Sequence, residues 1–438
     1  MKVLFLSVLA LALTACNGSD EGAAGQSSNA APPSTLASPV DVRTNADQSE
    51  GDQTAEADST PEETREPNAP QLEPLFEGQT RAPKPETTEA WTLETLAEGL
   101  DHPWALAFLP DGNLLVTEKP GMLRLISPEG EISEPIANVP EVHSPDRSQG
   151  GLLDVAIGPD FNESREIFMT FSEPDGEASR TAVGRARLND DGSALENVEV
   201  IFRQSPSYDS RGHFGSRIVF HPDGNLFVGL GDRMNAEIRT EAQNPMNHIG
   251  AVIRIAPDGS IPADNPFADG EDGAPEIWSF GHRNIQAAAL HPETNQVWTV
   301  EHGPRGGDEL NNPQPGANYG WPTITHGIEY QGDEIGEGIV DQEGMTPAVY
   351  FWDPVLAPSG MIFYTGEAFA NWQGDAIVGG LATERLSRLV MDGDRVVAEE
   401  WLEIGERVRD LAQGPDGAIY LVTDEDNGKV MRLVPESN

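Results

Sequence analysis

One phrase recurs along the chain: an apolar strand, a turn resembling Pro-Asp-Gly, and a second apolar strand. Its six copies begin at Ala105, Asp154, Arg217, Ala287, Met361 and Asp410. Further short strands lie between the copies, so that each unit holds about four strands, and no helical period is sustained in this region. Because a propeller blade is a four-stranded sheet, the repeat predicts an all-β protein with a six-bladed β-propeller. A two-sheet sandwich is the weaker alternative, since it would not repeat in this way.

The N-terminal residues differ from the repeats. Residues 1–16 combine a lysine, an apolar run and small residues, a pattern that predicts a secretory signal peptide. Their last four residues, LTAC, resemble a bacterial lipobox, so we expect Cys16 to be lipidated; an ordinary cleaved signal with an incidental cysteine is the alternative. Asn17 follows the cysteine in place of Asp, which favours an exported, periplasmic protein anchored in the outer membrane.

Residues 17–90 are rich in Ser, Thr, Ala, Pro, Glu and Asp and poor in large apolar residues. Such a composition predicts a disordered acidic linker, because little apolar surface is available to offset the entropy of ordering. Residues 91–438 then form the propeller domain. Cys16 is the only cysteine of the chain, so the propeller is expected to be held by its core without a disulfide.

The formal net charge is −46. This charge argues against nucleic acids and anionic membrane surfaces as partners, so contact with a membrane is expected only through the lipid anchor. The acidity is consistent with calcium binding or simply with solubility in a salty medium, and charge alone does not distinguish the two.

The stretch from Gly281 to Asn312 predicts a β-hairpin. An apolar strand over residues 285–290 is followed by a turn at Pro292 and by a second strand over residues 296–300. In this register the residues before the first strand lie opposite those after the second, at one end of the pair.

That end of the hairpin places Arg283 and Asn284 opposite Gly303 and Pro304. A guanidinium group binds carboxylate bidentately, so the two donors suit a planar, multiply anionic ligand. The carbonyls of the Gly-Pro turn and the acidic residues after it suit a hard cation such as calcium. The alternative is that Arg283 and Asp308 merely hold a loop in place.

Polar residues also stand just before the first strand of several copies. If that strand is innermost in each blade, these residues converge at one mouth of the central channel. They are Gln149, His213, Arg283, Asn284, Arg407 and Arg409. The returning strands are expected to bring Asp232 and Gly303 to the same rim, so that separate segments of the chain supply one site.

His213 and Asp232 flank one predicted hairpin and are expected to meet. A carboxylate that orients an imidazole makes a general base, here for proton abstraction from an alcohol with an anionic ligand as electron acceptor. The alternative is a structural histidine with satisfied hydrogen bonds. The chain has no P-loop, no GxGxxG at a strand-to-helix turn, no HExxH and no GxSxG elbow, so nucleotide, nicotinamide, zinc-protease and serine-hydrolase chemistry have no motif support.

The sequence resembles the soluble quinoprotein glucose/sorbosone dehydrogenases, in particular their aldose sugar dehydrogenase branch. The resemblance covers about residues 91–436 and rests on SQGGLLD, RGHFGSR, GLGDR, GSIPADNPF, GHRN, EHGPRGGDELN, GANYGWP, LATERLSRL and RVRD. Singly these motifs are modest signals, but in this order the set is highly specific. The resemblance implies a six-bladed propeller that holds pyrroloquinoline quinone (PQQ), a planar tricarboxylate, together with calcium at the channel mouth.

The resemblance also implies a role for individual residues. His213 would take the hydroxyl proton at the anomeric carbon of an aldose as hydride passes to the quinone, and Asp232 would orient His213. The quinone would be bound by Gln149, Arg283, Asn284, Arg407 and Arg409, and lined by Tyr330. Gly303 and Pro304 match the backbone-carbonyl ligands of the cofactor's calcium in the glucose dehydrogenases, and Glu309 and Tyr319, the latter through its carbonyl, match a calcium site of the aldose branch.

One position departs from the pattern of the glucose dehydrogenases. They place a lysine against the cofactor where this chain has Ala382. The segment from Leu381 through Ala382 to Thr383 is still expected to contact the ring through its backbone and small side chains. The loss of a cation is expected to weaken the binding of the tricarboxylate.

The predicted function is therefore PQQ-dependent oxidation of aldoses to lactones, with a natural electron acceptor that the sequence does not identify. A calcium-dependent propeller lactonase is a second enzyme class, although the arginine-rich rim speaks against it. A non-catalytic propeller that binds glycans or proteins is the third alternative; it would not need the pairing of His213 with Asp232 or an anion pocket.

Overall fold

The computed structural model describes residues 60–436 of the 438-residue chain. The predicted signal peptide, Cys16 and most of the predicted linker lie outside the described residues, so the proposals of export and lipid anchoring stay predictions. Within the described part, no helix combines the length and the hydropathy that a membrane crossing requires.

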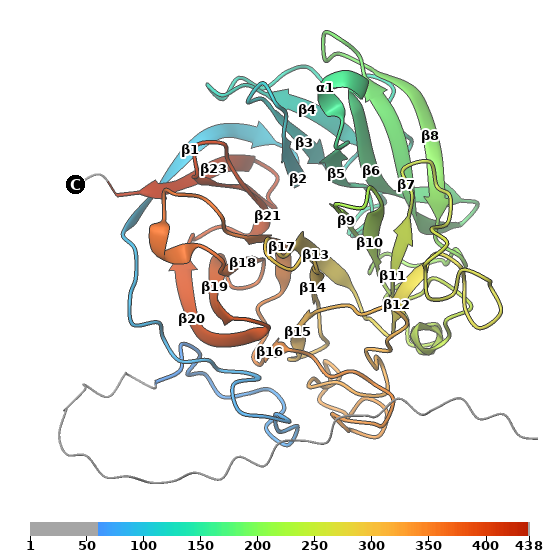
Figure 1. Ribbon diagram of the computed structural model, residues 1–438, viewed down its shortest axis with the longest axis vertical. Helices are drawn as coiled ribbons and strands as arrows, with labels where there is room; N and C mark the ends of the chain where they lie inside the picture. The colour runs from blue at the N-terminus through green and yellow to red at the C-terminus, as the bar shows by residue number, and fades with distance from the viewer. Residues whose placement is uncertain (1–59, 437–438) are drawn as a thin grey trace, which may run out of the picture. The chain divides into compact units, whose positions relative to one another are not determined.

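Six antiparallel sheets are arranged in a ring (Figure 1). We number the blades 1 to 6 in the order in which the chain enters them. Blade 1 contains β2 (Pro103–Phe108), β3 (Leu114–Glu118) and β4 (Met122–Ile126), and blade 2 contains β5 (Leu152–Ile157), β6 (Glu166–Asp175), β7 (Ala178–Leu188) and β8 (Leu195–Arg203). Blade 3 contains β9 (Gly215–Phe220), β10 (Leu226–Leu230), β11 (Ala251–Ile255) and β12 (Ile277–Phe280), and blade 4 contains β13 (Ile285–Leu290), β14 (Val297–Glu301), β15 (Asp308–Asn311) and β16 (Tyr350–Trp352). Blade 5 contains β17 (Pro358–Phe363), β18 (Ala376–Gly380), β19 (Arg385–Asp392) and β20 (Arg395–Glu403), and blade 6 contains β21 (Val408–Gln413), β22 (Ile419–Thr423), β23 (Gly428–Pro435) and β1 (Trp91–Leu100). The short helices are α1 (Phe161–Ser164), η1 (Arg239–Gln243) and η2 (Ala370–Trp372).

The first strand of every blade is its innermost strand. Strands β2, β5, β9, β13, β17 and β21 each contact the innermost strands of both neighbouring blades, which closes the ring. Strand β1 pairs with β23 at the outer edge of blade 6, so the first strand of the domain completes the last blade. The predicted six-bladed propeller is confirmed, and the hairpin predicted from Gly281 onward is the pair β13 and β14.

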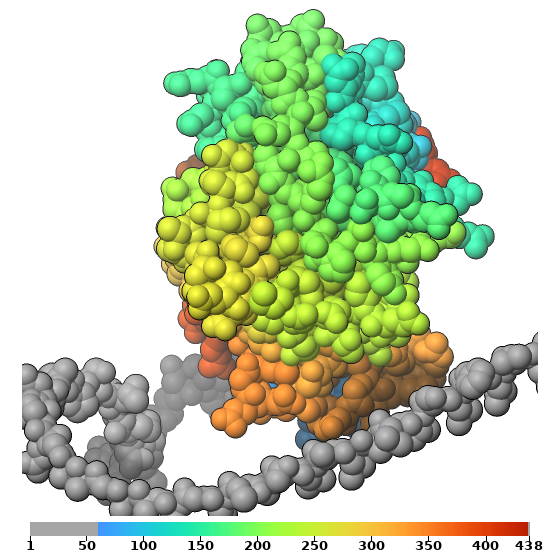
Figure 2. Space-filling view, turned by 90° about the vertical axis from the view of Figure 1, so that its right-hand side faces the viewer, coloured from blue at the N-terminus to red at the C-terminus, as the bar shows by residue number. Residues whose placement is uncertain are grey.

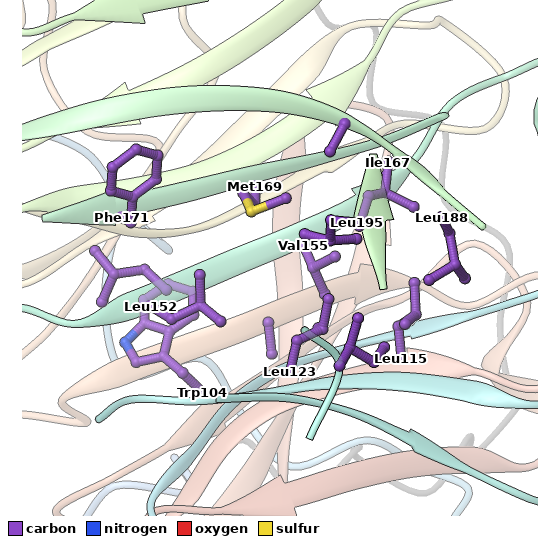
Figure 3. Close-up of a cluster of buried hydrophobic side chains, with 14 of the residues drawn as sticks. Trp104, Leu115, Leu123, Leu152, Val155, Ile167, Met169, Phe171, Leu188 and Leu195 are labelled. Carbon is purple, nitrogen blue, oxygen red and sulfur yellow. The ribbon is translucent and has the colours of Figure 1, made fainter. Parts of the chain in front are cut away.

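The core lies between the blades rather than in the channel. Between blades 1 and 2, apolar side chains from both sheets interdigitate, among them Leu115 of β3, Val155 of β5 and Met169 of β6 (Figure 3). All three are at most 4% exposed. Burial of each such side chain stabilises the fold by roughly 1.5–3 kcal/mol, so repeated interfaces of this kind hold the ring together without a disulfide.

Every innermost strand carries a shift of register near its N-terminal end, where it pairs with the second strand of its blade. The shift in β2 lies between Pro103 and Ala105 and so leaves Trp104 unpaired. The shifts in β13 and β21 leave Gln286 and Arg409 unpaired in the corresponding positions. A bulge of this kind bends a strand and re-aims a side chain. All six bulges lie at the same mouth of the channel, which is the mouth that the sequence predicted for the site.

A long loop joins β15 to β16 over residues 312–349. Isolated bridges tie it to the propeller, from Phe280 to Asn318 and from Arg305 to Ile328. Figure 2 shows this segment, in orange, covering the lower end of the propeller in that view. The loop matters for function because it brings Tyr319 and Trp321 to the channel mouth.

Residues 60–90 correct the expectation of a disordered linker that extends to residue 90. This segment packs on blades 4 and 5: the backbone N–H groups of Asn68 and Ala69 donate to the Asp353 carboxylate at 2.8 and 3.0 Å, and Gln79 donates to the carbonyl of Ala348. Gln79 is fully buried. Composition gave no sign of this order because the contacts to Asp353 and Ala348 are made by backbone and amide groups.

One buried histidine of the long loop predicts a pH dependence of stability. His326 is 3% exposed and stacks on Phe351 with ring centroids 3.9 Å apart. Burial lowers the pKa of His326 to about 4 from an ordinary value of 6.5. Between these values the unfolded chain binds a proton that the folded chain does not, so the contribution of this residue to stability is lost as the pH falls through this window.

The variant His326→Phe keeps the ring and removes the titration. Between pH 6 and pH 5 we expect the unfolding free energy of the wild type to fall by about 1 kcal/mol more than that of the variant. Urea unfolding of both proteins at pH 7, 6 and 5 measures this difference. Parallel pH curves for the two proteins would contradict the assignment.

Candidate active site at the channel mouth

The first component of the site is the pair His213 and Asp232. His213 precedes β9 and Asp232 follows β10, and the pairing of Gly215 with Leu230 brings the two side chains together. Nδ1 of His213 lies 2.5 Å from Oδ1 of Asp232, and both residues are buried. Gly231 allows this approach, because a Cβ at that position would lie 2.2 Å from the carbonyl oxygen of His213.

Further contacts keep Asp232 ionised. The indole Nε1 of Trp321 donates to its Oδ2 at 2.8 Å, and the backbone N–H of Met234 donates to its Oδ1 at 2.9 Å. Burial raises the pKa of Asp232, but the interaction with His213, the charge of Arg283 and the hydrogen bond from the backbone of Met234 outweigh burial, so the pKa lies below its ordinary value. A fixed carboxylate therefore faces the imidazole at neutral pH.

His213 itself is arranged as a neutral base. Burial lowers its pKa below the ordinary value; the Asp232 carboxylate opposes this shift and the charge of Arg283 adds to it. With Nδ1–H donated to Asp232, Nε2 is the acceptor atom, and it makes no hydrogen bond within residues 60–436. The backbone N–H of His213 donates to Oε1 of Gln149 at 2.8 Å, which ties the backbone of His213 to the segment before β5 of blade 2.

A cavity of about 270 Å³ lies at this mouth of the channel, and all six blades contribute to its lining. Its lining residues are Trp104, Lys119, Ser148, Gln149, Leu153, Phe214, Gly215, Gln286, His302, Ala357, Leu381, Ala382, Arg407, Arg409 and Asp424. Three of these are cations and one is a carboxylate, which gives a formal charge of +2 (3 − 1) in a chain of charge −46. Burial lowers the pKa of His302 to about 3, so its imidazole adds no charge near neutral pH.

Asp424 organises the cationic side of the cavity. It accepts from Arg409 at 2.5 Å and from Arg407 at 3.3 Å, and Arg407 also donates to the carbonyl of Leu381. Burial raises the pKa of Asp424, but the charges of Arg409, Lys119 and Arg407 outweigh it and the pKa lies below its ordinary value. Asp424 therefore holds Arg409 closely at the cavity wall and Arg407 through longer contacts.

A second, much smaller cavity of about 10 Å³ lies beside the first. It is lined by Arg283, Glu301, His302, Gly303, Pro304, Gly307, Glu309, Tyr319, Trp321, Ile324 and Thr325. His302 lines both cavities, and Trp321, which lines the smaller one, holds Asp232. Phe214 and Gly215, which directly follow His213, line the large cavity, so the dyad of His213 and Asp232 adjoins both cavities without lining either.

The small cavity is rich in oxygen atoms. The buried carbonyls of Gly303 and Pro304 accept no hydrogen bond within the described part of the chain. Burial, and next the adjacent charge of Glu301, raise the pKa of Glu309 well above its ordinary value. No group of three or more His, Cys, Asp and Glu side chains that could hold a metal occurs among residues 60–436, so any cation here would depend on backbone carbonyls.

Comparison with known proteins identifies the family. The family described as Glucose / Sorbosone dehydrogenase matches residues 100–432, which spans all six blades. The chain belongs to the glucose/sorbosone dehydrogenase family. The resemblance stated from the sequence is thereby confirmed.

Relatives within the glucose/sorbosone dehydrogenase family share the whole domain. Aldose sugar dehydrogenase YliI of Escherichia coli (strain K12) is 42% identical over 351 residues, which cover 79% of this chain and 93% of the relative. The crystal structure of the soluble aldose sugar dehydrogenase from Escherichia coli in the apo-form matches with a TM-score of 0.75 at 41% identity, covering 79% of this chain and 100% of that chain. The PQQ-bound form of aldose sugar dehydrogenase from Streptomyces coelicolor matches with a TM-score of 0.65 at 26% identity, covering 79% and 99%.

In this member of the family, the residues predicted for the site fall into three groups. The large cavity is lined by Gln149, Leu381, Ala382, Arg407 and Arg409. The small cavity is lined by Arg283, Gly303, Pro304, Glu309 and Tyr319. The third group, His213, Asp232 and Asn284, adjoins both cavities; Asn284 is fully buried and accepts from the backbone N–H of Gly215 at 3.1 Å.

His213, Asp232 and Asn284 line neither cavity themselves, and two further predicted residues, Tyr330 and Thr383, also lie outside both linings. Tyr330 is 65% exposed on the turn closed by the hydrogen bond from Gly332 to Glu329. Thr383 donates to the carbonyl of Leu356. A contact of either side chain with a cofactor stays a prediction.

Sequence reasoning missed Trp104, Lys119, His302 and Asp424. Lys119, His302 and Asp424 each follow the second strand of a blade, as Asp232 does, so the rule that located Asp232 could also have located them. Trp104 had no such signal, because a bulge in β2 brings it to the cavity.

Proposed function

We propose that the protein is a PQQ-dependent aldose dehydrogenase that oxidises the anomeric hydroxyl of aldoses to lactones. The observation that carries the proposal is an aspartate-bound, neutral imidazole at the edge of a positively charged cavity. The PQQ-bound relative from Streptomyces coelicolor and the aldose sugar dehydrogenase YliI support the cofactor and the class of substrate.

The lining of the large cavity fits PQQ. A tricarboxylate needs fixed cations, and Arg407 and Arg409 meet this need because Asp424 holds them without cancelling their combined charge. The buried Nε of Arg409 has no hydrogen-bond partner within residues 60–436, so it retains a donor for a ligand. Trp104 and Phe214 add aromatic surface to the lining for a flat ring system.

The proposed chemistry separates a proton from a hydride. PQQ, when bound, accepts the hydride that leaves the anomeric carbon. Nε2 of His213 accepts the proton of the anomeric hydroxyl, and the product is the lactone. Asp232 keeps the imidazole in the required tautomer and stabilises the charge that His213 acquires.

Calcium is expected at the small cavity. Its volume suits a single small ion, and its carbonyl and carboxylate oxygens are ligands that Ca²⁺ prefers. A cation would offset the repulsion between Glu301 and Glu309, and Gly303, Pro304 and Tyr319 would contribute backbone carbonyls. The shared wall at His302 would then couple cation binding to the shape of the cofactor cavity.

Reconstitution tests the proposal. Apoprotein is mixed with PQQ, Ca²⁺, both or neither, and reduction of a dye, which replaces the unidentified natural acceptor, is followed with a panel of aldoses. We expect turnover only when both are added, with one lactone formed per two electrons transferred to the dye. Lactone hydrolysis without the quinone would instead support the lactonase, and a folded protein silent in both assays would support a non-catalytic binding propeller.

A further inference from the structure

Lys119 occupies a distinct place in the large cavity. It follows β3 of blade 1, and its backbone is fixed by hydrogen bonds with His102 and Leu152. Its side chain lies close against Gly151, where a Cβ would meet the Lys119 Cγ at 2.7 Å and its carbonyl oxygen at 1.9 Å. The stem of Lys119 is thus held by the packing of blade 1 on blade 2.

The ammonium group of Lys119 differs from the other cations of the cavity. Arg407 and Arg409 are both engaged with Asp424, whereas the Lys119 ammonium makes no hydrogen bond or ion pair within residues 60–436. It lies close enough to Asp424 for its charge to act on that carboxylate. A half-buried ammonium next to a carboxylate already bound by two arginines retains its donors for a ligand.

We propose that Lys119 binds a carboxylate of the anionic cofactor and supplies the third cation of the site from blade 1. The inference rests on the proposed function, since it assumes that an aromatic polycarboxylate occupies the cavity. In this arrangement blade 6 supplies two arginines and blade 1 supplies the lysine, so the ligand is held across the seam where the two ends of the propeller meet.

The test measures binding rather than turnover. Trp104 lines the cavity, so quenching of tryptophan fluorescence reports PQQ binding to the apoprotein in the presence of Ca²⁺. Lys119→Met keeps the length of the stem and removes the charge; we expect about tenfold weaker binding and a smaller dependence of affinity on salt. Lys119→Arg should restore most of the affinity, which a purely structural role of the stem would not predict.

Lys84→Met is the matched control. Lys84 is 52% exposed and pairs with Glu62 on the segment before the propeller, so its loss should leave quinone affinity unchanged. Equal affinities of the wild type and Lys119→Met, with equal melting temperatures, would overturn the inference.

A second ligand separates this inference from the proposed function. Benzene-1,3,5-tricarboxylate is an aromatic polycarboxylate without a quinone. If the wild type binds this tricarboxylate but not PQQ, the proposed function fails. The role of Lys119 is then tested by comparing the affinities of the wild type and Lys119→Met for the tricarboxylate. If the wild type binds neither ligand, both proposals fail.

Discussion

Replacing His213 by Ala is expected to lower the turnover number of the reconstituted enzyme by roughly 10²–10⁴. The reason is that the proposed mechanism assigns proton acceptance to Nε2 of this residue, whose Nδ1 lies 2.5 Å from Asp232. Steady-state dye reduction measures the loss, and fluorescence titration with PQQ should show that the variant still binds the cofactor. The effect then lies in the chemical step and not in cofactor binding.

His221→Ala is the matched control for this variant. His221 follows the opposite end of the same strand, β9, where its Nδ1 accepts from the backbone N–H of Asp223. Its loss should leave turnover close to that of the wild type. Turnover of His213→Ala within about threefold of the wild type would show that another group takes the proton.

The pH profile provides an independent signature of His213. A base must be unprotonated to act, and burial places the pKa of His213 below the ordinary histidine value. The active form is therefore fully populated at neutral pH, and turnover should fall only as the pH decreases through that lowered pKa. A profile that loses activity on the acid side already above pH 7 would contradict the assignment.

Replacing Arg407 by Ala is expected to weaken PQQ binding by about 10- to 100-fold, because a charge-assisted hydrogen bond to a carboxylate is lost. The fold should change little, since the side chain is 39% exposed and its protein contacts, to Leu381 and Asp424, are long at 3.2 and 3.3 Å. Fluorescence titration gives the affinity and thermal unfolding gives the stability.

Two comparisons sharpen the Arg407 result. Arg407→Lys should recover only part of the affinity, because an ammonium group lacks the planar fork of a guanidinium group. Arg432→Ala removes an arginine from the same blade, where it pairs with Glu94 at the surface, and should leave affinity unchanged. An Arg407→Ala protein with the affinity of the wild type would remove this residue from the binding site.

The fold could be predicted from the sequence because the strand–turn–strand pattern that indicates it is local and recurs six times. Each copy of the strand–turn–strand phrase places buried apolar residues on a strand and a turn at its end, so the hairpins and their register follow from neighbouring residues. The pair of His213 and Asp232 followed from one such hairpin. Lys119 and Asp424 obey the same rule, as residues that follow second strands, and could have been included.

Contacts between residues far apart in the chain decide that residues 60–90 are ordered and which side chains line the cavity. Asp353 binds the backbone of Asn68 and Ala69 from more than 280 positions away in the chain, which no composition could indicate. Trp104 and Gln286 reach the cavity because bulges displace them from the regular alternation of their strands.

The sequence by itself determined the number of blades, the hairpins and the mouth of the channel at which polar residues gather. These features follow from alternation and turn chemistry over a few neighbouring residues. Only the tertiary structure decided which side chains share a cavity, because bulges, the closure of blade 6 by β1 and the loop that carries Trp321 depend on how separate blades pack. The physical reason is that strand alternation assigns a side chain to a face of its own sheet, whereas a site in the channel is made where six sheets meet.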